Sequence, residues 1–149
     1  MKTAFAAAMI CATACAASHG AAASGERAAL RPMVERHAQA NGIPAGVAHA
    51  LVTIESQYRP RIVHRGNYGL MQIRYETARS LGYRGTREGL LNAETNLNLG
   101  MKYFSRGWRL SGGELCRAIA FYQTGRPVKS VPSASRVYCA RARALMAAR

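Results

Sequence analysis

Aspartate is absent from this chain of 149 residues, and seven glutamates supply all of its carboxylate side chains. A mechanism that needs two neighbouring carboxylates is therefore disfavoured, and acid–base chemistry has few groups to draw on. The histidines and cysteines show no close ligand spacing, so we expect neither a metal ion nor another cofactor. No apolar run beyond the N-terminal segment has the length of a membrane span, which needs roughly 20 residues.

The N-terminal segment has the layout of a secretory signal peptide. Lys2 gives a positive start, residues 4–17 form an uncharged and alanine-rich stretch, and a run of three alanines ends at Ala23. We therefore expect residues 1–23 to be a signal peptide cleaved near Ala23, and residues 24–149 to form one domain.

Two alternatives for the N-terminus are less favoured. One is an uncleaved anchor. The other is a lipoprotein attached through Cys15, whose surroundings lack the leucine usual three places before a lipidated cysteine. Export places the mature protein in the periplasm.

The chain is strongly basic, with 21 Lys and Arg residues and a formal net charge of +14. Such a surface attracts polyanions. An exported protein rarely meets nucleic acid, so nucleic-acid binding is disfavoured, and an anionic wall polymer or membrane surface fits better. A solvated surface with no polyanion partner remains an equal alternative.

Two cysteines remain after cleavage of the signal peptide, Cys116 and Cys139. An even pair in an oxidising compartment predicts one disulfide. It would contribute about 3 kcal/mol by the chain-entropy estimate and would tether the C-terminal helix.

Helical periodicity dominates the chain. A helix is expected from 25 to about 39, followed by a stop at Asn41-Gly42. The apolar positions of the later helices are Val47, Leu51 and Ile54; Leu97, Met101, Phe104 and Trp108; Leu115, Ile119 and Tyr122; and Val137, Cys139 and Leu145. We predict an all-α, compact, multi-helix single domain, with a small irregular β element near 62–73 as the alternative to a purely helical chain.

Glu55 stands at the end of an apolar helical run and leads into a loop. A carboxyl group that faces a cleft there would be partly desolvated, and desolvation raises its pKa. A carboxylic acid of that kind can donate a proton near neutral pH, as cleavage of a glycosidic bond requires. Considered alone, any one glutamate is more often a solvated surface residue.

Four sequence motifs favour a catalytic role for Glu55 over that of a solvated surface residue. They are Glu55-Ser56-Gln57-Tyr58-Arg59-Pro60; Gly69-Leu70-Met71-Gln72-Ile73; the segment from Asn92 through Asn96 and Gly100 to Tyr103-Phe104; and Ala120-Phe121-Tyr122-Gln123-Thr124-Gly125. In this order they resemble the E-S-x-(F/Y)-x-P, G-L-M-Q-(L/I), N-x-x-x-N-I-x-x-G-x-x-Y-L and A-Y-N-x-G blocks of the soluble lytic transglycosylase catalytic domain, which is related to goose-type lysozyme. The resemblance covers about 43–125.

This resemblance implies a lysozyme-like helical fold and cleavage of the β-1,4 bond between N-acetylmuramic acid and N-acetylglucosamine in peptidoglycan. By analogy, Glu55 donates a proton to the glycosidic oxygen and then accepts one from the C6 hydroxyl of the muramyl sugar. That hydroxyl closes a 1,6-anhydro ring, and no water is consumed. A single carboxylate suffices for this route, in agreement with the composition.

The resemblance also implies substrate-binding roles for five residues: Ser56, Met71, Gln72, Tyr122 and Gln123. Tyr122 would place its hydroxyl near Glu55 and help to orient it. The alternatives are a polar helix end for Ser56 and core packing for Met71 and Tyr122. Glu94 is interpreted as a helix-start residue and not as a second catalytic carboxylate.

The chain departs from the family at three places. Gln123 replaces the usual asparagine, Tyr75 replaces a proline, and residues 64–68 replace a loop of smaller side chains.

Two other functions stay open: a hydrolytic muramidase of the same fold, and a non-catalytic peptidoglycan-binding module. We expect a monomer whose partners are peptidoglycan glycan strands, and its small size suggests service to a secretion or surface machine.

Overall fold

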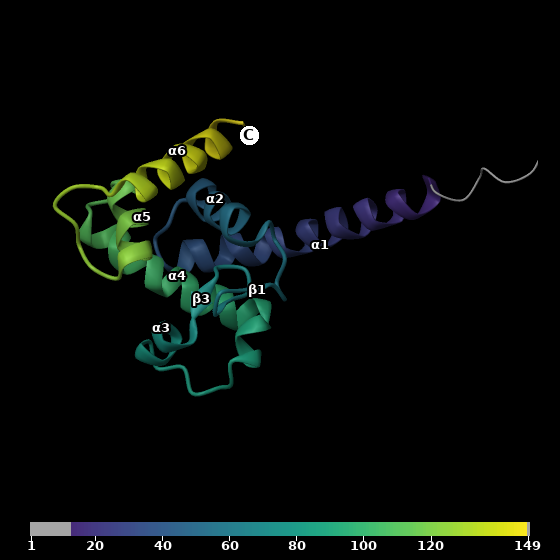
Figure 1. The fold of residues 1–149 in the computed structure, drawn as a ribbon, viewed down its shortest axis with the longest axis horizontal. Coiled ribbons are helices and arrows are strands. Elements are labelled where there is room, and N and C mark those ends of the chain that lie inside the picture. The colour runs from purple at the N-terminus through teal and green to yellow at the C-terminus, as the bar shows by residue number, and fades with distance from the viewer. Residues whose placement is uncertain (1–12, 149) are drawn as a thin grey trace, which may run out of the picture.

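The computed structural model describes the backbone of residues 13–148 and the side chains of residues 24–148. The start of the predicted signal peptide, residues 1–12, lies outside the described residues. The helices are α1 (Thr13–Ala40), α2 (Ala45–Ser56), α3 (Tyr75–Ser80), α4 (Ala93–Leu110), α5 (Leu115–Thr124) and α6 (Ser133–Ala147), with one 3₁₀ turn, η1 (Glu88–Leu91). The predicted mainly α architecture is confirmed (Figure 1).

Helix α1 begins earlier than predicted. It starts at Thr13 instead of Gly25 and runs without a break through Ala23, the expected cleavage site. Alanine has the highest helix propensity, and the alanine-rich segment therefore continues the helix. Its first turns extend away from the other elements (Figure 1). Cleavage near Ala23 stays a prediction.

The core lies where α1, α2 and α4 meet. Val34 on α1, Leu51 on α2 and Phe104 on α4 are completely buried. The turn between α1 and α2 falls where the sequence predicted it, because Gly42 adopts a left-handed φ of 66° that ends the helix. Pro44 then precedes the first turn of α2, where its missing N–H costs no hydrogen bond.

Local capping explains the limits of α4 and α5. The side chain of Asn92 accepts a hydrogen bond of 3.0 Å from the backbone N–H of Thr95 and so acts as the N-cap of α4. Glu114 caps α5 in the same way through bonds to the N–H groups of Cys116 and Arg117. A left-handed Gly125 ends α5.

A small antiparallel sheet occupies the stretch where the sequence left a β element open. Strands β1 (Val63–His64), β2 (Asn67–Tyr68) and β3 (Ile73–Arg74) pair in that order. Both residues of the first turn are left-handed, Arg65 at φ 49° and Gly66 at φ 77°, as a two-residue type I′ hairpin requires. The hairpin therefore has a fixed register, His64 opposite Asn67.

Asn96 joins this sheet to α4. The buried side chain accepts a hydrogen bond from the Met71 N–H at 2.7 Å and donates to the carbonyl oxygens of Tyr68 and Leu90 at 2.7 and 2.8 Å. Because Asn96 is buried, a backbone group left unpaired beside it would be costly. The second asparagine of the third motif is therefore a structural residue that joins α4 to the turn between β2 and β3 and to η1.

Replacing Asn96 with alanine is expected to lower the free energy of unfolding by about 3–5 kcal/mol, because it leaves three buried backbone groups unpaired. Denaturant unfolding followed by circular dichroism measures this loss. Asn98→Ala is the matched control, since Asn98 is exposed on the same helix. Equal stability of the two variants would contradict the assignment.

The predicted disulfide between Cys116 and Cys139 is present and links α5 to α6, with a Cα–Cα distance of 5.2 Å. Tyr138, Cys139 and Ala142 form the buried face of α6. Within residues 13–148, none of the helices has both the length and the apolar character that a membrane span needs.

Candidate active site

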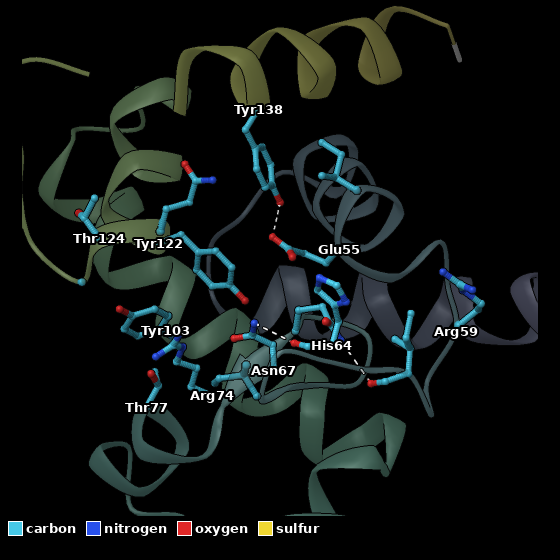
Figure 2. A pocket seen from close by; sticks show the side chains of 16 residues that line it. Glu55, Arg59, His64, Asn67, Arg74, Thr77, Tyr103, Tyr122, Thr124 and Tyr138 are labelled. Carbon is cyan, nitrogen blue, oxygen red and sulfur yellow. Dashed lines mark hydrogen bonds between the residues drawn. The ribbon is translucent and has the colours of Figure 1, made fainter. Parts of the chain in front are cut away.

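A groove of about 980 Å³ runs between the end of α2, the sheet and helices α4, α5 and α6. Figure 2 shows its side chains from close by, with Glu55 at the centre and Tyr138 pointing down to it from α6. Residues 54–74 supply one wall, residues 103–125 supply a second, and Tyr138 completes it. The groove therefore depends on parts of the chain that are remote in sequence.

The backbone turns sharply after Glu55. Gln57 and Tyr58 are both left-handed, with φ values of 54° and 63°, and they end α2 at Ser56. Consecutive left-handed residues other than glycine are strained and need support from their surroundings. Tyr58 is buried, and its hydroxyl makes a hydrogen bond with His49. This contact holds the turn, and the turn leaves Glu55 facing the groove.

Burial raises the pKa of Glu55 to about 7. Two weaker influences oppose this: the hydrogen bond from Tyr138 and the positive charge of Arg141 both lower the pKa. Near neutral pH the group is therefore divided between its protonated and ionised forms. A carboxyl group in that state can both donate and accept a proton.

Tyr138 is the functional residue that the sequence reasoning missed. Its hydroxyl donates a hydrogen bond of 2.7 Å to Oε1 of Glu55, across 83 positions of the chain (Figure 2). Burial, followed by the nearby Glu55 charge, raises the pKa of Tyr138 well above its usual value, so the hydroxyl stays a donor. Its position beside Cys139 was the one available signal, because the disulfide fixes that turn of α6.

Tyr122 lines the groove, but its hydroxyl has a different partner from the one predicted. It donates to the backbone carbonyl of Met71 at 2.5 Å. Burial is the main reason that the pKa of Tyr122 is raised well above its usual value, and the Glu55 charge adds to it. Tyr122 therefore lies within electrostatic reach of Glu55, while the hydrogen bond that orients Glu55 comes from Tyr138.

Ser56 and Met71 are turned away from the groove. The Ser56 hydroxyl donates to the carbonyl of Val52 at 3.1 Å, and the residue is buried. The Met71 side chain is fully buried and packs against Gly100, where an added Cβ would lie 2.4 Å from the Cβ of Met71. Neither side chain lines the groove. Core packing, the alternative weighed for Met71, describes its position, and a substrate-binding role for either residue remains untested.

Gln72 and Gln123 both line the groove. Gln72 is left-handed, and its amide nitrogen donates to the carbonyl of Gly69 at 3.0 Å. The amide oxygen of Gln123 accepts a hydrogen bond of 2.7 Å from the hydroxyl of Ser135 on α6. The methylene that distinguishes Gln123 from the family asparagine thus lets its amide reach α6.

Glu55 supplies the one carboxylate among the side chains that line the groove. Glu94, the other glutamate weighed for catalysis, lies outside it and binds Arg36 at 2.6 Å and His37 at 2.8 Å. The hydrogen bond from Arg36 is the main cause that lowers the pKa of Glu94. Residues 13–148 also hold no group of three His, Cys, Asp or Glu side chains placed to bind a metal.

The mainly helical architecture, with Glu55 in a groove beside a small sheet, is a lysozyme-like fold, as the sequence predicted. The family model for the transglycosylase SLT domain matches residues 32–134, and the chain belongs to this family. The predicted family is thereby confirmed. Comparison with curated proteins found no match.

Two solved structures illustrate the similarity. The 70 kDa soluble lytic transglycosylase from Escherichia coli has 25% sequence identity and a TM-score of 0.58 over 76% of this chain. An inactive glutamate-to-glutamine mutant of the lytic transglycosylase Slt from Pseudomonas aeruginosa has 20% identity and a TM-score of 0.66 over 78% of this chain. The chain spans only 19% and 23% of those two proteins.

Proposed function

We propose that this protein is a peptidoglycan lytic transglycosylase, which cleaves the β-1,4 bond between N-acetylmuramic acid and N-acetylglucosamine without adding water. The observation that carries this proposal is Glu55, a lone carboxyl group in the groove with a pKa raised to about 7. A two-carboxylate mechanism would need a second such group nearby. The groove offers only this one, and the same group must therefore serve both steps.

In the first step the protonated Glu55 gives its proton to the glycosidic oxygen, and the bond between that oxygen and C1 of the muramyl sugar breaks. The electron pair leaves with the oxygen, and C1 becomes electron-deficient. In the second step the ionised Glu55 takes the proton of the C6 hydroxyl, whose oxygen bonds to C1. The carboxyl group ends protonated, as it began, and the product carries a 1,6-anhydro ring.

Tyr138 and Arg141 support the ionised form of Glu55 between these two steps. The Tyr138 hydroxyl donates to the carboxylate, and the Arg141 charge attracts it. Burial supports the protonated form at the start and at the end of the cycle. The opposing influences keep the two forms close in free energy, which suits a group that changes role.

The wall polymer lies outside the cytoplasm, and the predicted signal peptide over residues 1–23 agrees with that location. We therefore propose that the protein acts in the periplasm as a monomer on peptidoglycan glycan strands. Service to a secretion or surface machine remains a hypothesis that rests on the small domain. Strong bulk lysis of cells that overproduce the protein would contradict it.

Mass spectrometry of the soluble products from purified peptidoglycan tests the proposed reaction. We expect products about 18 Da lighter than hydrolysed muropeptides, because the ring closure replaces water. Products with reducing ends would instead identify a muramidase. Binding to the wall polymer with no released product would identify a non-catalytic binding module.

Replacing Tyr138 with phenylalanine is expected to move the alkaline limb of the pH profile to higher pH. The lost hydrogen bond stabilises the ionised form of Glu55, so its removal raises a pKa that is already about 7. The acid must be protonated at the start, and activity therefore persists further into the alkaline range. At the optimum we expect kcat/KM to fall roughly tenfold. An unchanged alkaline limb would show that Tyr138 does not act on the acid.

A further inference from the structure

The wall of the groove away from Tyr138 is basic. His64, Asn67 and Arg74 are neighbours across the three strands, because Asn67 pairs with His64 on one side and with Arg74 on the other. Residues directly opposite each other in a sheet share a face, and all three line the groove. In Figure 2, Asn67 and Arg74 lie on the side of Glu55 away from Tyr138. The guanidinium group of Arg74, which is exposed, stands at one end of this row of three residues.

A smaller cavity of about 180 Å³ lies beside the groove. It is lined by Arg65, Gly66, Tyr68, Arg74, Tyr75, Glu76 and Arg87, and we call it the basic notch. Arg74 lines both cavities, so the notch adjoins the groove at that residue. A substituent on a sugar strand in the groove could extend past Arg74 into the notch.

The charges of the basic notch are unbalanced. Glu76 is its one carboxylate, and that group is 3.6 Å from Arg87, whose guanidinium also lies 4.7 Å over the ring of Tyr75. Across the described residues, no ion pair involves Arg65 or Arg74, and both are exposed. Two guanidinium groups therefore remain available to a carboxylate, which arginine binds through two parallel hydrogen bonds.

We propose that the basic notch binds the carboxylates of the peptide stems that the muramyl sugars carry, and that Arg65 and Arg74 make the protein prefer stem-bearing strands over bare glycan. In a stem-bearing strand the sugars themselves are uncharged, because each lactyl carboxyl group is bound in an amide to its stem, so the guanidinium groups recognise the stems. A stem tethered to a sugar in the groove has a high effective concentration at the notch. This inference rests on the proposed function, since it needs a glycan strand in the groove.

The double variant Arg65→Gln/Arg74→Gln tests this assignment. The matched control is Arg79→Gln/Arg84→Gln, which removes the same charge from exposed residues that line neither cavity. Three substrates are compared: stem-bearing strands free of phosphate polymer, the same strands with amidated stem carboxylates, and strands stripped of their peptides by an amidase, whose newly exposed lactyl carboxylates are then amidated. The first substrate excludes phosphate as the source of any anion effect.

For the wild type we expect KM to be about tenfold lower on stem-bearing strands than on bare or amidated strands. The notch variant is expected to lose this preference through KM, with kcat nearly unchanged, because a remote substituent contributes equally to the ground and transition states. The control variant is expected to keep it. Equal KM values for all three substrates with the wild type, or an equal loss in the control variant, would overturn the inference while leaving the proposed reaction intact.

A binding measurement keeps the test independent of activity. Calorimetric titration of Glu55→Gln with a disaccharide-peptide is expected to give about tenfold tighter binding than titration with its amidated form. Adding Arg65→Gln/Arg74→Gln is expected to remove that difference. If the wild type forms no product from any strand, the proposed reaction fails. Equal affinities for the two ligands would overturn the assignment of the notch as a carboxylate-binding site, whether or not the proposed reaction is confirmed.

Discussion

Glu55→Gln is expected to reduce the rate of anhydro-product formation by roughly 10³-fold, within the range that a positioned general acid contributes. Glutamine has nearly the same shape but cannot give up a proton to the glycosidic oxygen or accept one from the C6 hydroxyl. Initial rates on purified peptidoglycan, with products separated by mass, measure this loss. Binding to the wall polymer should be retained.

Glu94→Gln is the appropriate control, because Glu94 lies outside the groove and binds Arg36 and His37 on the surface. It should keep nearly full activity. If Glu55→Gln retained the activity of the control, the proton donor would have to be another group. Loss of folding is not expected in Glu55→Gln, since a neutral amide replaces a carboxyl group whose burial already favours its neutral form.

Removing the disulfide should lower the stability of the domain substantially. The variant Cys116→Ser/Cys139→Ser is expected to unfold with a free energy lower by about 3 kcal/mol, because the disulfide closes a long loop in the unfolded chain. For a domain of this size the corresponding fall in Tm is roughly 10 °C. Thermal unfolding followed by circular dichroism measures it, and the wild type treated with reductant should behave in the same way.

The disulfide variant should also lose activity before it unfolds globally. Tyr138 precedes one of the two bonded cysteines, and its hydroxyl is the hydrogen-bond donor to Glu55. A loosened α6 would remove the Tyr138 hydrogen bond and also expose the carboxyl group to water, and because burial is the larger influence the pKa of Glu55 would fall. Equal activity of the oxidised and reduced wild type at 25 °C would show that packing alone holds α6 in place.

Local patterns in the sequence predicted the parts of the fold that local forces determine. The apolar spacing of Leu97, Met101 and Phe104 placed the buried face of α4. The Cys116–Cys139 bond followed from counting cysteines and from the predicted compartment. Each of these features depends on neighbouring residues or on a simple pairing.

The details of the candidate site depend on contacts between distant residues, which periodicity does not reveal. The hydroxyl groups of Tyr122 and Tyr138 have different partners, Met71 and Glu55, and nothing in the local sequence separates the two. The same reason explains Ser56, whose hydroxyl bonds to its own helix instead of facing the groove. The strained turn at Gln57 and Tyr58 is likewise held by His49, from within α2.

The hydrogen bond between Tyr138 and Glu55 has a consequence for biosynthesis. The two residues are 83 positions apart, and the later one lies on α6, which leaves the ribosome after α2 and α5. A chain that has emerged only as far as α5 carries Glu55 without its donor and without the helix that covers it. We therefore expect the acid to gain its final environment only after the rest of the domain has been delivered. If the proposed function is correct, the nascent chain would therefore be inactive until α6 has packed against Glu55.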